Sequence, residues 1–100
     1  MIHVLAIITA KAGQRSAVLE AFAANRPTVL AEEGCIEYGA AVDVESMGTA
    51  AFGPDSFVVI EKWESADHLK AHAAAPHVKE YGVKTKDMVA ARAIHVLRPV

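Results

Sequence analysis

The sequence predicts an α+β fold, a ferredoxin-like βαββαβ sandwich of one sheet and its helices. Three observations predict it. The chain has 100 residues, which is enough for one core and too few for two. Four short segments are rich in apolar and β-branched residues, and the segments between them repeat apolar residues at helical spacing. No repeat or linker divides the chain, so residues 1–100 are expected to form a single domain.

The first strand is predicted over Ile2–Thr9, where even and odd positions are both apolar. A helix is predicted over residues 13–33, because apolar residues recur there on one helical face. Pro27 is expected to kink or restart this helix, since proline removes one hydrogen bond and clashes with the preceding turn. Gly34 is expected to cap its C-terminal end.

The second and third strands are predicted over Cys35–Val44 and Phe57–Trp63. The former alternates, with Ile36 and Tyr38 on one face, and the latter has an apolar centre. The segment between them, Ser46–Ser56, has no periodicity and contains glycine and proline. Together they are expected to form a hairpin with a long loop.

The last third of the chain predicts two helical segments and a fourth strand. Ser65 is a good N-cap for a helix that runs to the alanine run at 73–75. Pro76 is expected to begin a second helical segment whose apolar spacing extends to Val89. The final strand is predicted over Ala91–Val100.

One face of the predicted sheet is left without a cover. The first strand is apolar on both faces, and the third is nearly so, whereas this topology places its helices on one face only. No residues remain to cover the other face. A second copy packing sheet against sheet with twofold symmetry is therefore expected, which predicts a homodimer.

Composition excludes several classes of protein. Apolar residues make up 53% of the chain and charged residues 22%, which excludes a disordered chain. The formal net charge of −2 gives no basic surface for nucleic acid or an anionic membrane. No apolar stretch is long enough to span a bilayer, and no signal peptide is recognised, so a cytoplasmic location is expected. The single cysteine, Cys35, excludes an intrachain disulfide.

Five histidines raise the question of metal binding. His68 and His72 have the i, i+4 spacing of two ligands on one helix, and His77 or Glu61 could supply a third. This pattern is common in helices, and no carboxylate stands at the usual helical offset, so no metal site is expected. Sequence motifs for nucleotides, dinucleotides, serine hydrolysis and zinc proteolysis are also missing, and no cofactor is expected.

The candidate chemistry centres on the third strand and the following helix. His72 lies at the edge of a buried helical face, where a neutral imidazole can act as a base or can simply be a half-buried structural residue. Glu61 shares a strand face with Phe57, Val59 and Trp63. A carboxylate between such neighbours must be paired or have its pKa raised. Two interpretations of that strand face remain open. It can form a binding site with aromatic walls beside a carboxylate, or it can be part of the hydrophobic core with an ion pair at the end of the strand.

Tyr38 lies on the apolar face of the second strand, where a phenol can both pack and donate a hydrogen bond. Packing in the core is the alternative interpretation. His3 and His95 lie in the outer strands and are assigned structural roles only.

Two stretches resemble the antibiotic biosynthesis monooxygenase (ABM) domain family. The sequence EGCIEY at residues 33–38 resembles the family's EpGC-x-x-Y/F turn. EKWES at 61–65, followed by LKAH at 69–72 and PH at 76–77, resembles its E-x-W-x-S…L-x-x-H-x-x-x-P-H pattern. The resemblance covers most of the chain. It implies a dimeric α+β barrel with an apolar pocket between each sheet and its helices.

The resemblance also implies an activity, a monooxygenase that oxidises a small aromatic compound, a quinol or a polyketide-type phenol with dioxygen and without metal, flavin or haem. In that case His72 and Trp63 are the expected catalytic residues. The expected substrate-binding residues are Tyr38, Phe57, Val59, Glu61 and His77. Two alternatives remain: an isomerase or other proton-transfer enzyme, which the His72…Pro76-His77 pattern also resembles, and a non-enzymatic dimer that binds a small molecule.

Overall fold

The computed structural model describes residues 1–100 and has the predicted α+β ferredoxin-like architecture. One antiparallel sheet has the strand order β2-β3-β1-β4. Its strands are β1 (Ile2–Ala10), β2 (Cys35–Ala41), β3 (Ser56–Trp63) and β4 (Val89–Leu97). The helices are α1 (Arg15–Leu30), α2 (Ala66–Ala74) and α3 (Pro76–Thr85), followed by a 3-10 turn at Lys86–Met88.

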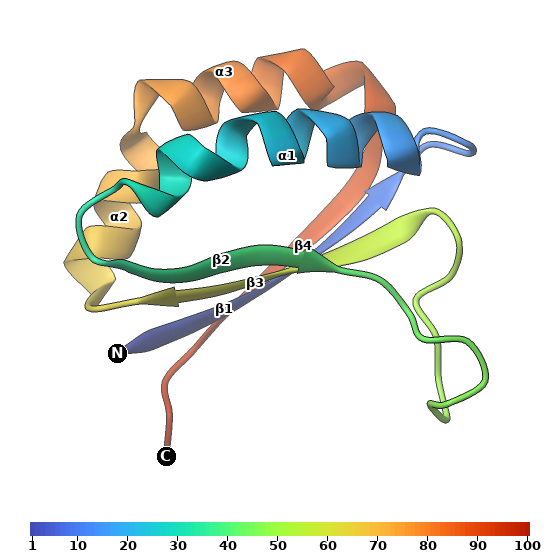
Figure 1. Ribbon diagram of the computed structural model, residues 1–100, viewed down its shortest axis with the longest axis horizontal. Helices are drawn as coiled ribbons and strands as arrows, with labels where there is room; N and C mark the ends of the chain where they lie inside the picture. The colour runs from blue at the N-terminus through green and yellow to red at the C-terminus, as the bar shows by residue number, and fades with distance from the viewer.

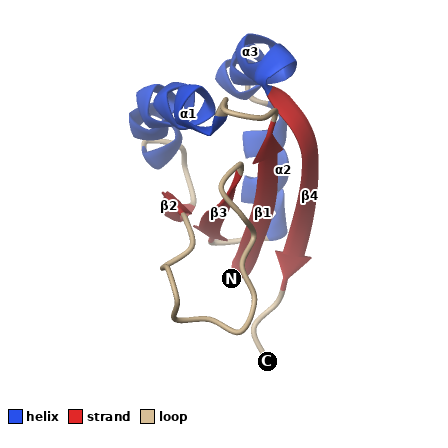
Figure 2. Cartoon of the chain, turned by 90° about the vertical axis from the view of Figure 1, so that its right-hand side faces the viewer, coloured by secondary structure: helices blue, strands red, loops and turns tan.

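The helices lie on one side of the sheet. Helices α1 and α3 run side by side above it, and α2 packs near the end where β3 leads into the helix (Figures 1 and 2). Two clusters of buried side chains fill the space between the layers. One joins Phe22 of α1 to Phe57 of β3, and the other joins Val4, Val29 and Trp63. The second cluster lies directly beside the candidate residues.

The prediction for the end of the first helix was wrong. Helix α1 passes through Pro27 without a break and ends at Leu30, and Ala31 is its C-terminal cap. A single turn follows the proline, and that turn is anchored by Val29, which is fully buried. Gly34 instead shapes the turn into β2, with a φ of 81°.

The second strand is shorter than predicted and carries a register shift between Cys35 and Glu37. The shift leaves Ile36 half exposed, while Cys35 and Tyr38 lie opposite helix-facing residues of β3. The predicted face shared by Ile36 and Tyr38 was therefore wrong, because a bulge breaks the alternation. The strand stops before Asp43, whose carboxylate accepts hydrogen bonds from two backbone N–H groups of the following loop.

The predicted hairpin of β2 and β3 with a long loop is confirmed. Ser65 caps α2 as predicted, its hydroxyl accepting a hydrogen bond from the backbone N–H of His68. The last helical segment ends at Thr85 rather than reaching Val89, because the chain tightens into the 3-10 turn and Val89 opens β4. The fourth strand is correspondingly shifted toward the N-terminus and ends at Leu97.

The face of the sheet opposite the helices carries apolar side chains in contact with solvent. Leu5, Ile60 and Leu97 are each between about a third and a half exposed there. The prediction that β1 and β3 are apolar on both faces is therefore confirmed. None of the helices combines the length and the apolar character needed to cross a membrane.

Candidate functional site

Strand β3 presents the four predicted side chains to the helices. Phe57 and Trp63 are fully buried, and Glu61 is 7% exposed. The indole Nε1 of Trp63 donates a hydrogen bond of 2.9 Å to Oε1 of Glu61. Burial raises the pKa of Glu61 above its ordinary value, while this hydrogen bond and the nearby His72 partly oppose the rise. Val59, on the same face, is buried between Phe57 and Glu61.

Helix α2 brings His72 against this strand. Its ring lies 4.6 Å from Trp63 and 5.7 Å from Tyr38, between ring centroids. Its Nδ1 lies 2.6 Å from Oε2 of Glu32. A carboxylate only accepts hydrogen bonds, so Nδ1 donates, and Nε2 of the neutral ring carries the free lone pair.

The free nitrogen of His72 remains accessible. Nε2 makes no hydrogen bond within the chain, and the only fully buried side-chain nitrogens and oxygens without a partner are the two ring nitrogens of His77. Nε2 therefore keeps contact with the space outside the packed core. A neutral imidazole with an accessible lone pair can accept a proton from a bound ligand.

Tyr38 of β2 completes the aromatic wall. It lies opposite Glu61 in the strand register, and its ring stacks on Phe22 at 5.1 Å. Burial raises the pKa of its phenol well above the ordinary value, with the charge of Glu61 adding to the rise. The phenol is therefore neutral across the physiological range. Its hydroxyl makes no hydrogen bond within the chain and is free to donate to a ligand.

Glu32 is the residue that the sequence analysis missed. It lies in the turn between α1 and β2, and Oε2 of its carboxylate contacts both Nδ1 of His72 and, at 3.4 Å, Nε2 of His77. The helix of His72 itself carries no carboxylate at the usual helical offset. No sequence pattern pointed to it, because the pairing of Cys35 with Trp63 that brings this turn beside the site is set by the strand register.

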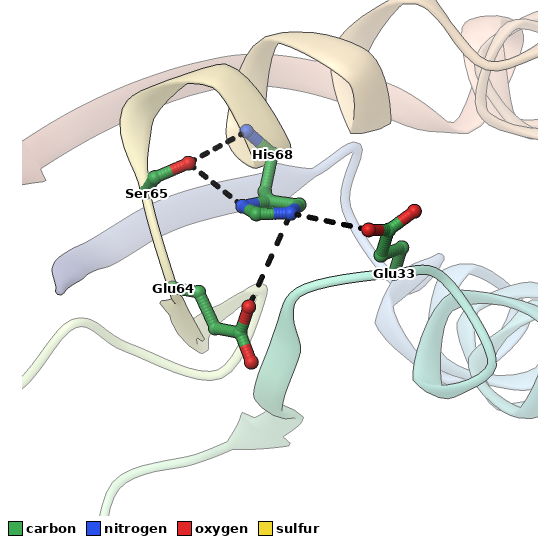
Figure 3. Close-up of polar contacts among 4 residues, drawn as sticks. All are labelled: Glu33, Glu64, Ser65 and His68. Carbon is green, nitrogen blue, oxygen red and sulfur yellow. Dashed lines mark hydrogen bonds and ion pairs between the residues drawn. The ribbon is translucent and has the colours of Figure 1, made fainter.

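The two histidines considered as metal ligands have separate partners. His68 contacts Ser65 through Nδ1 at 2.7 Å, and its Nε2 lies 3.9 Å from Glu33 and 4.0 Å from Glu64 (Figure 3). His72 turns toward Glu32 instead. The structure contains no group of three or more histidine, cysteine, aspartate or glutamate side chains placed to hold a metal ion.

His77, predicted to bind substrate, lies at the start of α3 with its ring centroid 6.4 Å from that of His72. Although Nε2 lies near Glu32, the geometry is not that of a hydrogen bond, so both ring nitrogens are unpaired. His77 also borders a cavity of about 220 Å³ between α1 and α3, together with Ala21, Asn25 and Tyr81. Of the predicted site residues, only His77 lines this cavity.

Three larger cavities are not lined by His72. One of about 400 Å³ opens on the uncovered face of the sheet and touches Glu61 and Leu97. Another, of about 630 Å³, lies along the loop after β2, and its lining includes Arg15 and Asp43. Residues of that loop supply most of its lining, and none of the predicted site residues belongs to it.

Comparison with known proteins matches the chain to one family. Residues 1–83 match the family described as antibiotic biosynthesis monooxygenase. The chain is 44% identical over 102 residues to an Escherichia coli K12 protein named "Probable quinol monooxygenase YgiN", covering 99% of this chain and 98% of that protein.

Solved structures share the fold at lower identity. A protein from Nitrosomonas europaea that bears the same family name superposes with a TM-score of 0.85 at 18% identity, over 100% of this chain and 99% of that one. PA3566 from Pseudomonas aeruginosa superposes with a TM-score of 0.84 at 22% identity, over 99% and 93%. The predicted family, fold and monooxygenase class are thus confirmed, and the chain belongs to the antibiotic biosynthesis monooxygenase family.

Proposed function

We propose that this protein is a monooxygenase that oxidises a small quinol with dioxygen and uses no metal, flavin or haem. The observation that carries the proposal is the accessible Nε2 of a buried, carboxylate-held His72, in a chain 44% identical along its whole length to a relative named as a quinol monooxygenase. The aromatic walls of Tyr38 and Trp63 beside that nitrogen suit a flat ring.

The chemistry needs one proton acceptor and a dry surrounding. Nε2 of His72 takes a proton from a quinol hydroxyl, and the resulting anion transfers one electron to dioxygen. The substrate radical and superoxide combine into a carbon-bound peroxide, whose O–O bond breaks as the adjacent C–H proton is lost. Quinol and dioxygen thereby give a hydroxyquinone and water, and all electrons come from the substrate.

The remaining predicted residues have positions that fit supporting roles. Tyr38 donates its neutral hydroxyl to a substrate oxygen, and Trp63 forms one wall of the ring site while holding Glu61. Phe57 and Val59 pack beneath this wall and exclude water. These roles are proposals that rest on the contacts described above.

The cavity between α1 and α3 is the proposed entrance for substrate. Its volume of about 220 Å³ is below the roughly 300–1,000 Å³ of pockets for larger ligands, which favours a single ring or a small fused ring system. His77 borders this cavity, while its two unpaired ring nitrogens are buried.

We further propose that the protein works as a homodimer in the cytoplasm. The exposed apolar side chains of Leu5, Ile60 and Leu97 lie on the face that no helix covers, and a second copy would bury them by sheet-to-sheet packing. Light scattering on the wild type should give twice the chain mass. Ile60→Lys should shift it to the mass of one chain, and a wild type at monomer mass at all concentrations would contradict the dimer.

The activity is tested by oxygen-electrode measurements on chelator-treated protein with a panel of quinols. Uptake that requires both protein and substrate supports the proposal. His72→Ala should remain folded and lose most of this uptake, because the proton acceptor is gone. His68→Ala is the matched control, since its side chain belongs to a separate surface contact (Figure 3). Equal activity in folded His72→Ala protein would remove this histidine from the mechanism.

A proton-transfer reaction without dioxygen is the alternative that the same geometry favours. The accessible Nε2 of His72 would also serve an isomerase, in which a proton is removed and returned at a neighbouring carbon. Turnover of substrate with no consumption of dioxygen would establish that alternative. Binding of an aromatic ligand without any turnover would instead indicate a non-enzymatic binding dimer.

A further inference from the structure

We propose that Glu32 is the positioning residue of this site: its carboxylate fixes the tautomer and ring orientation of His72 and stabilises the imidazolium formed when the ring accepts a proton. The inference rests on the proposed function for its consequence in turnover. It assigns a role to a residue that lies outside the strand and helix carrying the other candidates.

The contact has the geometry that this role requires. Oε2 of Glu32 lies 2.6 Å from Nδ1 of His72, which is in the range of charge-assisted hydrogen bonds. The glutamate side chain is 18% exposed and the histidine side chain 9%, so water screens the pair little. With Nδ1 thus occupied, only Nε2 is available to a substrate.

The turn that carries Glu32 is fixed at several points. The backbone N–H of Glu32 donates to the carbonyl of Val29, and its own carbonyl accepts from Cys35. Two residues on, the carbonyl of Gly34 accepts from the N–H of Glu64, which ties the turn to the end of β3. The carboxylate is therefore presented from backbone anchored on both α1 and the sheet.

Other titratable groups lie near the carboxylate of Glu32 and its partner His72. His77 approaches the same Oε2 at 3.4 Å from α3, and a protonated His77 would add a favourable charge. From the sheet, Glu61 of β3 and Tyr38 and Cys35 of β2 are the titratable groups that face the pair. The contact between Oε2 of Glu32 and Nδ1 of His72 places a negative charge directly beside the imidazolium that forms when Nε2 accepts a proton.

The chemical consequence concerns substrates that still hold their proton. A neutral quinol depends on His72 to remove that proton, whereas a quinol already ionised in solution does not. Loss of Glu32 should therefore slow the first class strongly and the second class little. A residue that only maintained the fold would affect both classes alike.

The test compares Glu32→Gln, Glu32→Asp and the wild type, with Glu33→Gln as the matched control. Glu33 is the next residue, is almost fully exposed and contacts only His68, at 3.9 Å. At neutral pH with a quinol of high hydroxyl pKa, Glu32→Gln should lose on the order of 100-fold in kcat, as for other losses of acid–base assistance. KM should change little, Glu32→Asp should recover part of the loss, and Glu33→Gln should match the wild type.

The pH profile separates positioning from a structural effect. The loss in Glu32→Gln should shrink as pH rises through the hydroxyl pKa of the quinol, and it should be small for a quinol with an acidic hydroxyl. A loss of the same factor at every pH and with every quinol would overturn the proposal. So would a folded Glu32→Gln protein within about 3-fold of wild-type kcat on the neutral quinol.

Imidazole NMR provides a readout that does not depend on activity. ¹⁵N-labelled wild-type protein should show His72 with its proton on Nδ1, and Glu32→Gln should show this tautomer reduced or mixed with the Nε2–H form. A wild-type His72 protonated on Nε2 alone would overturn the proposal. If the oxygen assay gave no uptake with any quinol while NMR showed the expected tautomers, the proposed function would fail and the positioning of His72 by Glu32 would stand.

Discussion

Replacing Gly34 by alanine should destabilise the protein and disturb the site, although Gly34 itself contacts no candidate catalytic residue. An added Cβ would lie 2.3 Å from Cγ of His68, far inside any real contact. The backbone φ of 81° adds a second cost, since side chains disfavour this region by about 1–2 kcal/mol. The imidazole must move by about 1 Å, which breaks its 2.7 Å contact with Ser65 (Figure 3).

Gly13→Ala is the matched control, because Gly13 has a φ of 77° but nothing within 4 Å of the added Cβ. Both variants share the cost of positive φ and the opposing gain of about 0.4–1 kcal/mol from a stiffer unfolded chain. Only Gly34→Ala also loses the Ser65–His68 contact and weakens the cap of α2, together about 1–3 kcal/mol. The expected losses are therefore about 1 kcal/mol for Gly13→Ala and 2–4 kcal/mol for Gly34→Ala.

Urea unfolding followed by tryptophan fluorescence measures both free energies, since Trp63 is the only tryptophan and is fully buried. Oxygen uptake should fall in Gly34→Ala alone, because the turn also carries Glu32. Equal destabilisation of the two variants would refute the argument from the His68 contact. Full activity in Gly34→Ala would refute the link between this turn and the site.

Three further outcomes follow from the buried and loop groups. Burial raises the pKa of Glu61, so the stability that this group contributes is full below its unfolded pKa and is lost as pH rises through its folded pKa. The free energy of unfolding of Glu61→Gln, measured by urea titration, should therefore increase relative to that of the wild type as pH increases. Two backbone hydrogen bonds lower the pKa of Asp43, so this group stabilises the folded state above its unfolded pKa and does so less as pH falls. Asp43→Ala should speed amide hydrogen exchange at Phe52 and Gly53. Unchanged exchange at these two amides would contradict the role of Asp43 as the anchor of the loop. Tyr38→Phe keeps the stacked ring but lacks the hydroxyl. Its kcat/KM should fall about 2- to 12-fold, the loss of one hydrogen bond, with no change in the unfolding midpoint. An unaltered kcat/KM would exclude the phenol from substrate binding.

Periodicity in the sequence was sufficient for the fold, because the elements carry apolar residues at the spacing of their own geometry. The face formed by Phe57, Val59, Glu61 and Trp63 followed from strand alternation alone, and so did the need to pair or neutralise Glu61. Local rules failed where tertiary packing decided the outcome. Helix α1 continues through Pro27 because its final turn is held by the burial of Val29 in the core. The residues around Pro27 alone could not predict this continuation.

The sequence could predict which site residues lie together only where they belong to the same strand or helix. Trp63 and Glu61 are two positions apart on one strand, whereas Glu32 and His72 are 40 residues apart and meet through the turn at Gly34. Such a pair depends on strand register, including the bulge after Cys35, which no pattern of apolar residues revealed. The predicted site residues themselves remain predictions until the variants are measured.

Glu32 and Glu61 both lie near the imidazole of His72, and their different surroundings suit them to different roles. Glu32 lies within charge-assisted hydrogen-bond range of Nδ1 of His72. Glu61 is buried deeper, has one hydrogen bond from Trp63, and has a raised pKa. In the proposed reaction, a quinol gives its proton to His72, the carboxylate of Glu32 balances the new imidazolium, and the substrate keeps the remaining negative charge. That charge is repelled less by a carboxyl with a raised pKa than by an ordinary glutamate, and a protonated carboxyl would donate a hydrogen bond to it. Under the proposed function, the burial of Glu61, which is costly to the fold, would therefore favour the substrate anion that reacts with dioxygen.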